Sequence, residues 1–171
     1  MRNYTLTIFI LSLGIVYSQI DPNTIDIVRD DYGVPHIFAP TDAEVAYGLA
    51  WAHAEDDFKT IQQGYLAGNN QLSKSIGNGG LGADFIAQFI GSEALYKERY
   101  ESDISEAYKK VVEGYRQGIN NYAATHPEEV LVTGFFPITT KEMIRYAQLQ
   151  LFISSKGDQW VQRIINNDLQ Y

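Results

Sequence analysis

A single apolar stripe on a long predicted helix constrains the fold of this chain more than any other feature. Thr41 stands three residues before Glu44, the spacing of a capping box that begins a helix. From there to about Leu66, apolar residues recur at steps of four and three, which keeps them on one helix face. These residues are Tyr47, Trp51, Ala54, Phe58, Ile61 and Tyr65. A stripe of this length must be covered by other parts of the protein.

One short hairpin is the only sheet structure that the sequence predicts. Ile25 and Ile27 alternate with Asp26, which is the period of a strand with one buried face. Turn chemistry follows at residues 32–35, and residues 36–39 are expected to form a second short strand. A lone hairpin is marginally stable and cannot cover several helices. The pattern therefore indicates part of a larger α+β fold.

Three more helices and one irregular stretch are expected after the first helix. Residues 64–82 contain six glycines together with Asn and Ser, which predicts a loop or broken structure. A helix of uncertain limits follows from near Ser92, with Ser92 as its N-cap. The clearest helix covers about residues 103–124 and ends at a Thr-His-Pro sequence. The last begins at residue 139 or 140 and continues to about residue 154.

Composition excludes several classes of function. The chain has 171 residues, of which 45% are apolar, as is typical of a globular protein. The formal net charge is -8 and no basic run exceeds Lys109-Lys110, so a nucleic-acid partner is not expected. The absence of cysteine from the sequence excludes disulfides and thiolate metal sites.

The N-terminus has the pattern of a secretory signal peptide. A basic residue precedes an apolar run over residues 6–16, and Val16 and Ser18 stand at the two positions that a signal peptidase reads. The run is shorter than the roughly 20 apolar residues that span a bilayer. The alternatives are an uncleaved anchor or a buried strand. We expect cleavage after Ser18, which removes residues 1–18 as a signal peptide and leaves residues 19–171 as one incomplete domain. The mature protein is expected to be periplasmic or secreted, without membrane contact.

Histidines and three adjacent acids raise the question of a metal or acid–base site. Glu55, Asp56 and Asp57 would point about 100° apart on a helix, so they cannot converge on one ion. His53 and Asp57 are four residues apart and could share a ligand, but a zinc site of that kind needs further ligands from elsewhere. Paired or solvated acids are therefore the favoured interpretation. His36 is expected to be a partly buried histidine that makes one hydrogen bond.

The sequence shows no complete catalytic centre. It has no Gly-x-Ser-x-Gly element and no cysteine nucleophile. Some hydrolases cut themselves before a serine and use the new N-terminal amine as the base, and Gly91-Ser92 could in principle be such a point. The helix-cap interpretation of Ser92 is favoured. The residues alone therefore indicate an exported, acidic α+β piece without its own nucleophile.

Five segments taken together resemble the beginning of the penicillin acylase family, which belongs to the N-terminal-nucleophile hydrolases. They are RDDYGVPHI at residues 29–37, YGLAWA at 47–52, AEDDF at 54–58, GYRQGINNY at 114–122 and FPIT at 136–139. The ordered combination is much more specific than any single segment. The resemblance covers nearly all of the chain from Gln19 to about Asp158.

The resemblance implies a fold, a partner and a mechanism. The family has an αββα fold made of an α-chain and a larger β-chain, both cut from one exported precursor. The new N-terminal serine of the β-chain attacks the amide carbonyl, and its own α-amine acts as the base. In that family these groups lie in the β-chain, so no catalytic residue is expected in this chain, which would be either a truncated precursor or an α-chain numbered with its signal peptide. The acidic helix and the Gly-Val-Pro-His turn are then fold markers, not catalytic groups.

The resemblance also places part of a substrate pocket on the last predicted helix. In the family this helix lines the acyl pocket, and the nearest apolar candidates here are Leu149, Leu151 and Phe152. Consecutive residues point to different faces, so Leu151 and Phe152 are not expected to line the pocket together. The alternative is that all three residues belong only to the core.

No cofactor is expected from this chain. Some relatives bind calcium partly through an α-chain Glu after the pocket helix, but residues 157–171 contain no Glu, and Asp158 and Asp168 are the acids there. The expected partners are the β-chain and a small acylated amide, such as an N-acyl-homoserine lactone, an acyl peptide or a β-lactam. The expected activity is therefore removal of an acyl group from an amide. The alternative is a secreted, non-catalytic helical binding module that keeps the α-chain fold.

Overall fold

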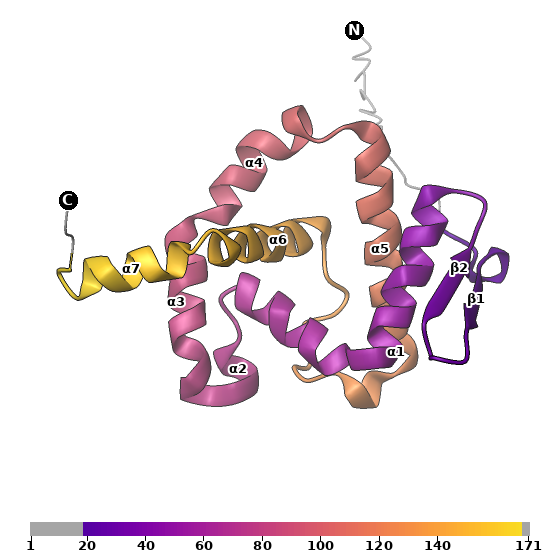
Figure 1. Ribbon diagram of the computed structural model, residues 1–171, viewed down its shortest axis with the longest axis horizontal. Helices are drawn as coiled ribbons and strands as arrows, with labels where there is room; N and C mark the ends of the chain where they lie inside the picture. The colour runs from indigo at the N-terminus through magenta and orange to yellow at the C-terminus, as the bar shows by residue number, and fades with distance from the viewer. Residues whose placement is uncertain (1–18, 169–171) are drawn as a thin grey trace, which may run out of the picture.

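The computed structural model describes residues 19–168, and this part of the chain is mostly helical (Figure 1). It contains one antiparallel hairpin, made of β1 (Asp26–Arg29) and β2 (Pro35–Phe38). The described α-helices are α1 (Asp42–Gly68), α2 (Ser73–Ile76), α3 (Leu81–Ile90), α4 (Ser92–Asp103), α5 (Glu106–Thr125), α6 (Thr140–Ser154) and α7 (Gly157–Ile165). Short 3-10 helices cover Pro22–Thr24, Gly77–Gly80 and Pro127–Glu129. The expected fold class, mostly helical with a short N-terminal hairpin, is confirmed. The expected signal peptide at residues 1–18 lies outside the described residues.

The hairpin lies against the first half of α1. β1 and β2 pair with Ile27 opposite Ile37. An added Cβ at Gly48 of α1 would stand 2.7 Å from the Ile37 side chain and 3.0 Å from that of Ile25. Gly48 therefore allows the strands to approach the helix closely. The alternating isoleucines that predicted a half-buried strand are the residues that make this contact.

α1 and α5 form the main helical pair and lie side by side (Figure 1). Their backbones approach closely because α5 carries glycine where it meets α1. An added Cβ at Gly114 would collide with the backbone of Ala43, and one at Gly118 with the backbone of Tyr47. A glycine also allows the close approach of α1 to α6, because a Cβ at Gly68 would collide with the backbone of Tyr146.

The core forms where α1, α5 and the segment before α6 meet, and the stripe predicted on α1 faces it. Within that stripe, Ala54, Phe58 and Tyr65 are buried in the core cluster, and Trp51 and Ile61 are partly buried against it. The other members of the buried cluster are Ala50, Leu66, Ile119, Tyr122, Ala123, Phe135 and Ile138. The helical period of the sequence therefore predicted the buried face of α1 correctly.

α1 is not one straight helix, although its sequence pattern is continuous. Asp57 has φ -160° and ψ 70°, which interrupts the helix and produces the bend in Figure 1. The Asp57 carboxylate accepts a hydrogen bond from the backbone N–H of Thr60 at 3.0 Å. Asp57 thus begins the second half of the helix in the manner of an N-cap. The three consecutive acids were interpreted as paired or solvated residues of a continuous helix, so the break at Asp57 was not predicted.

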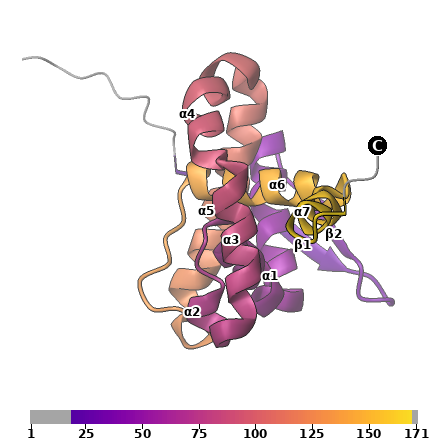
Figure 2. The same cartoon turned by 90° about the vertical axis from the view of Figure 1, so that its left-hand side faces the viewer.

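Residues 64–82 contain more helix than their glycines suggested. α1 continues to Gly68, α2 and a 3-10 helix follow, and α3 begins at Leu81. Asp84 of α3 accepts hydrogen bonds from the backbone N–H groups of Leu72 and Ser73 at 2.7 and 3.1 Å, which ties α2 to α3. The expectation of a loop over the whole stretch was therefore wrong, whereas the alternative expectation of broken structure describes the four-residue α2 and the four-residue 3-10 helix. Figures 1 and 2 show α3 and α4 following one another along one side of the molecule.

The junction between α3 and α4 corrects the expected role of Ser92. Gly91 adopts the left-handed conformation, with φ 67°, and occupies the N-cap position of α4. Ser92 is the first residue of α4 and is buried. Glycine takes the cap because the sharp join between two successive helices requires a positive φ, which costs glycine little. Ser92 is consequently not the N-cap.

α6 begins as predicted, whereas α7 was not foreseen. Thr139 caps α6 with Glu142 in a reciprocal capping box. α7 follows after Lys156, which has φ 61°, and it extends away from α1 and α5 at one end of the molecule (Figure 1). Along the described part of the chain, no helix combines the length and the apolar character needed to cross a membrane.

Candidate functional site

The motif at residues 114–122 attaches α5 to α1. Gly118 makes the close approach possible, and Ile119 beside it is completely buried in the core. Asn121 donates a hydrogen bond from its side-chain amide to the hydroxyl of Tyr47 on α1. The residue types of this motif therefore follow from helix packing, and none of these three residues is placed for chemistry.

Tyr122, the last residue of the motif, organises an aromatic cluster. Its ring stacks on His126 with 4.1 Å between centroids and meets Trp51 and Phe58 edge-on at 5.2 and 5.0 Å. Edge-to-face pairs of this kind add to the stabilisation that burial alone provides. His126 is thereby a structural residue at the end of α5, and its ring nitrogen contacts the backbone oxygen of Tyr122 at 3.1 Å.

Two amide side chains fix the connector at residues 126–139, which leads from α5 into α6. Asn120 of α5 donates to the carbonyl of Ile138 at 2.9 Å and accepts from its N–H at 2.8 Å. Gln62 of α1 donates to the carbonyl of Glu129 at 3.0 Å and accepts from the N–H of Leu131 at 2.9 Å. Each amide therefore pairs with the connector backbone as a neighbouring strand would.

Neither of these two amide roles was predicted from the sequence. Gln62 is 1% exposed, although it is a polar residue. Its position offered a signal, because it lies four residues after Phe58 and three before Tyr65 on the buried face of α1. A polar residue within an apolar stripe must find hydrogen-bond partners when it is buried. Such a residue predicts that an irregular backbone segment packs against it.

The three candidate pocket residues on α6 have different surroundings. Leu149 is 5% exposed and faces the interior, whereas Leu151 is 67% exposed. Phe152 is partly buried, and an added Cβ at Gly157 would collide with its ring, so the ring lies against the start of α7. Of the three candidates, Leu151 has an exposed side chain, whereas Leu149 and Phe152 pack within the chain.

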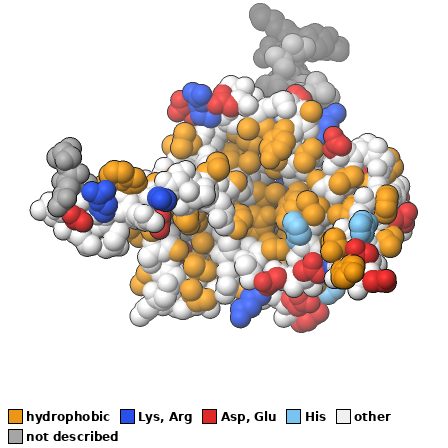
Figure 3. Space-filling model, viewed as in Figure 1, with side chains coloured by type: hydrophobic (Ala, Val, Ile, Leu, Met, Phe, Trp, Pro, Cys, Tyr) orange, Lys and Arg blue, Asp and Glu red, His pale blue; other side chains and the backbone are white. Residues whose placement is uncertain are grey.

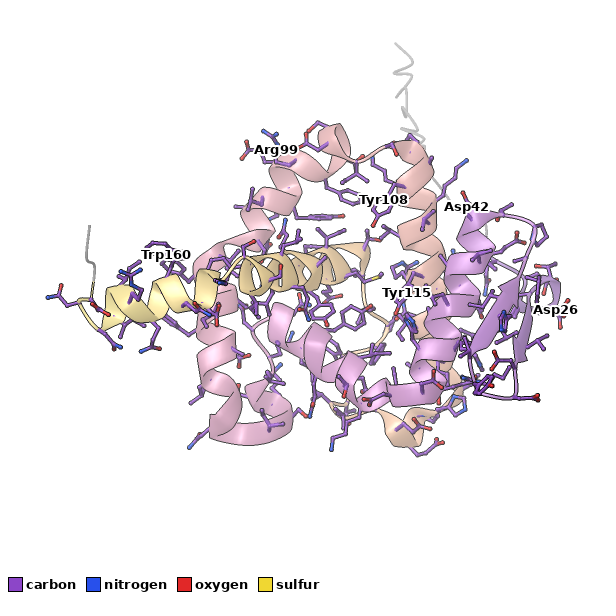
Figure 4. All side chains as sticks on the ribbon, in the orientation of Figure 1. Asp26, Asp42, Arg99, Tyr108, Tyr115 and Trp160 are labelled. Atoms are coloured by element: carbon purple, nitrogen blue, oxygen red, sulfur yellow. The ribbon has the colours of Figure 1, made fainter. Side chains whose placement is uncertain are left out.

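Apolar side chains gather over the middle of one face, where α1, α5 and α6 meet (Figure 3). Tyr115 of α5 lies in this region (Figure 4), and its hydroxyl is 3.1 Å from Nδ1 of His53 on α1. Tyr146 of α6 packs edge-on against Tyr65 at 5.2 Å and accepts a hydrogen bond from Gln150 at 2.6 Å. Burial raises the pKa of Tyr115 to about 12, with the neighbouring Tyr146 adding to the shift. The Tyr115 hydroxyl therefore stays protonated at neutral pH and acts as a hydrogen-bonding group only.

The acids that suggested a metal site hold the hairpin on α1. Arg29 of β1 contacts Glu55 at 3.2 Å and Asp56 at 2.8 Å, and it also donates to the carbonyl of Gly33 at 2.9 Å. Glu55 accepts a second hydrogen bond, from the indole N–H of Trp51 at 2.9 Å. Arg29 therefore connects the hairpin turn and β1 to α1.

Asp30 and His36 form the turn of the hairpin. Asp30 accepts from the backbone N–H groups of Tyr32 and Val34 at 2.9 and 3.0 Å, and its second oxygen is 3.3 Å from Nε2 of His36. The contact with His36, followed by those with the two N–H groups, holds the pKa of Asp30 below its usual value. Gly33 supplies the positive φ, 81°, that the turn requires. His36 was expected to be partly buried and is exposed, with this one side-chain contact.

The candidate groups that the sequence singled out are not brought together among residues 19–168. His53 contacts Tyr115 and Asp57 contacts Thr60, so the two do not share a ligand. No group of three or more His, Asp or Glu side chains in this range is placed to hold a metal ion. Ser92 is 2% exposed at the junction of two helices, which removes it from contact with a substrate. Among the described residues, helix α6 is held by its capping box and by the connector before it, and two of its apolar side chains, Leu151 and Ile153, are exposed.

A hairpin on a bent helix, followed by helices packed through glycines, defines a known class of fold. The structure is similar to the thermostable penicillin G acylase of Alcaligenes faecalis, with a TM-score of 0.61 and 19% sequence identity. The alignment covers 81% of this chain and 74% of that chain. At this identity the likeness shows the fold alone.

The family model described as penicillin amidase matches residues 24–161, and the chain belongs to that family. It is 23% identical over 145 residues to the acyl-homoserine lactone acylase PvdQ of Pseudomonas syringae, covering 77% of this chain and 18% of that protein. It is 26% identical over 97 residues to the penicillin acylase 2 proenzyme of a Pseudomonas species, covering 57% of this chain and 12% of that protein. The chain thus spans less than a fifth of the length of either of these curated relatives.

Proposed function

We propose that this chain is the α-chain part of an exported amide hydrolase that removes an acyl group from a small amide. Family membership over residues 24–161 is the observation that carries the proposal. The relatives are named as acylases of homoserine lactones and of penicillins, so the acylated amide is the chemistry that they share. The substrate class includes N-acyl-homoserine lactones, acyl peptides and β-lactams.

What the described residues provide supports a division of labour between two chains. They hold no activated nucleophile, so an attacking serine with its own α-amine as base would come from a β-chain. Donors that stabilise the oxyanion would come from there as well. The role left for this chain is to position α6 as one wall of the acyl pocket, through Asn120 and the capping box at Thr139.

Exposed apolar surface supports a β-chain partner. Leu81, Phe85 and Phe89 recur every four residues on α3 and are 55%, 59% and 62% exposed. Leu151 on α6 and Trp160 on α7 are exposed as well, and Figure 4 shows Trp160 projecting from the far end of the molecule. Large apolar side chains left open on several helices mark surfaces that another chain covers.

The test is expression of the full-length gene product with its own leader. We expect two chains after self-cleavage and hydrolysis of at least one of the three substrate types, measured by release of the free amine. Ser92→Ala should be cut and active like the parent, because Ser92 is buried at a helix junction. A folded product that stays uncut and binds acyl amides without hydrolysing them would instead indicate the non-catalytic binding module.

Substitutions of Leu151 and of Phe152 are expected to have different effects on acyl specificity. We propose that Leu151, the open member of the pair, contacts the acyl group and that Phe152 supports α7. Leu151→Ala should therefore shift preference toward longer or bulkier acyl chains, by about 1–3 kcal/mol for each methylene-sized difference. Phe152→Ala should lower activity equally for all chain lengths and reduce the melting temperature, because its ring packs against Gly157.

A series of substrates with increasing acyl length, assayed on the complete enzyme, separates the two residues. The ratio of kcat/KM between long and short substrates is the decisive quantity, since it is unaffected by a uniform loss of active protein. Leu149→Ala is the matched control, because Leu149 is buried and should behave as Phe152 does. A changed ratio for Phe152→Ala and an unchanged ratio for Leu151→Ala would reverse the assignment.

A further inference from the structure

The expected signal cleavage creates a reactive N-terminus. Cleavage after Ser18 would make Gln19 the first residue of the mature chain. The α-amine of a protein has a pKa near 8, so an appreciable fraction is uncharged and nucleophilic at neutral pH. In an N-terminal glutamine, this amine and the side-chain amide carbon are at the right separation to close a five-membered ring.

The structure leaves Gln19 free while it fixes the residue that follows. The backbone N–H of Ile20 donates to the side-chain oxygen of Gln117 on α5 at 2.9 Å. Gln19 itself is exposed, and within residues 19–168 no hydrogen bond holds its side-chain amide. The anchor at Ile20 lies beyond the atoms that would form the ring. Ring closure therefore needs no other part of the chain to move.

The carboxylates near Gln19 already have hydrogen-bond partners, including Asp21, which accepts from the backbone N–H and the side-chain amide of Asn23. Gln19 borders two shallow grooves of about 450 and 440 Å³ on α5, and Glu113 lines both. Glu113 already accepts hydrogen bonds from Arg116 and from Gln117. Glu44, in the second groove, accepts from the hydroxyls of Thr24 and Thr41. An ammonium at residue 19 would thus compete with existing partners, whereas a neutral ring would not.

We infer that Gln19 becomes pyroglutamate, an N-terminal modification that rests on the export step of the proposed function. The α-amine nitrogen attacks the side-chain carbonyl carbon Cδ, and the N–Cδ bond forms while the Cδ–Nε2 bond breaks. The side-chain nitrogen leaves as ammonia and carries away an amine proton, so no oxidant or co-substrate is required. The product is a chain end with no positive charge and no free amine.

Peptide mass spectrometry of the exported full-length protein tests this inference. Trypsin should release residues 19–29, which end at Arg29 and contain no other basic residue. We expect the mass of this peptide to be lower by one ammonia, and the intact protein to resist aminopeptidase. Gln19→Asn is the matched control, because asparagine would have to close a four-membered ring, and it should show a free amine.

Three outcomes would overturn the inference. The first is a residue 19–29 peptide that keeps an unmodified glutamine after purification and overnight incubation. The second is an isotope-labelled synthetic copy, added at lysis, that cyclises as fully as the protein does, which would make the ring a product of handling. The third is an N-terminus at another residue, including an uncut peptide beginning after Arg2. The acylase assay on the same sample reports independently on the proposed function.

Discussion

Replacing Gly118 with valine will destabilise the protein by about 3 kcal/mol, because the helix pair α1–α5 has no space for a side chain there. A Cβ at this position would collide with the backbone of Tyr47 and stand 2.9 Å from Cβ of Ala50. Backbone atoms cannot move aside as a flexible side chain can, so the two helices would have to separate. The separation would also loosen the hydrogen bond between Asn121 and Tyr47. Thermal and urea denaturation of the full-length protein measure the effect.

Two other glycines provide the controls for this prediction. Gly114→Ala should be destabilising as well, since its Cβ would meet the backbone of Ala43. Gly82→Ala, in α3, should be neutral or stabilising by about 0.5–1 kcal/mol, because no atom lies within 4 Å and alanine is the better helix former. If Gly118→Val and Gly82→Ala have equal melting temperatures, the close approach of α1 and α5 does not exist in solution.

The sequence predicted best those elements whose signals are periodic. The stripe on α1, the cap at Thr41 and the alternating isoleucines of the hairpin all depend on local spacing. These features correctly gave the face of α1 that is buried. They also gave the fold class, because a hairpin with several amphipathic helices has few other arrangements.

The features that were missed depend on contacts between distant residues. α3 was not predicted, because the glycines before it indicated a loop. In the structure Asp84 joins α3 to α2, and several of those glycines form the 3-10 helix between them. The break at Asp57 interrupts a continuous apolar pattern, so periodicity could not show it. Ser92 was expected to cap a helix, and the preceding Gly91 takes that position through its positive φ.

The sequence predicted the region of the candidate site but not the residues that hold this region in position. The resemblance pointed to α6 and to Leu149, Leu151 and Phe152, and only their exposure in the structure distinguishes Leu151 from the other two. The amides that position α6, Gln62 and Asn120, act on backbone atoms well separated from them in the sequence. Residue type does not reveal such a partner, because an amide side chain can pair with any peptide group.

Asn120 is the residue whose loss should affect this site most. Asn120→Leu removes both hydrogen bonds to Ile138 and leaves its N–H buried without a partner, whereas its carbonyl keeps the contact with Arg116 at 3.3 Å. One unsatisfied buried N–H and one weakened carbonyl should cost about 2–3 kcal/mol. Because Ile138 lies directly before the cap of α6, the wall of the proposed pocket should shift as well. Activity should therefore fall by a larger factor than the fraction of folded protein does.

Asn121→Ala is the matched control, since Asn121 is the neighbouring amide and bonds to Tyr47 on α1, away from the connector. It should cost about 1 kcal/mol, the net value of one hydrogen bond. Its kcat/KM per folded molecule should match the parent, while that of Asn120→Leu should be reduced for every acyl length. Asn120→Asp should be intermediate, because it still accepts from the N–H of Ile138 but no longer donates to its carbonyl. Equal activity per folded molecule in Asn120→Leu and Asn121→Ala would mean that the connector does not position α6 and that Asn120 serves stability alone.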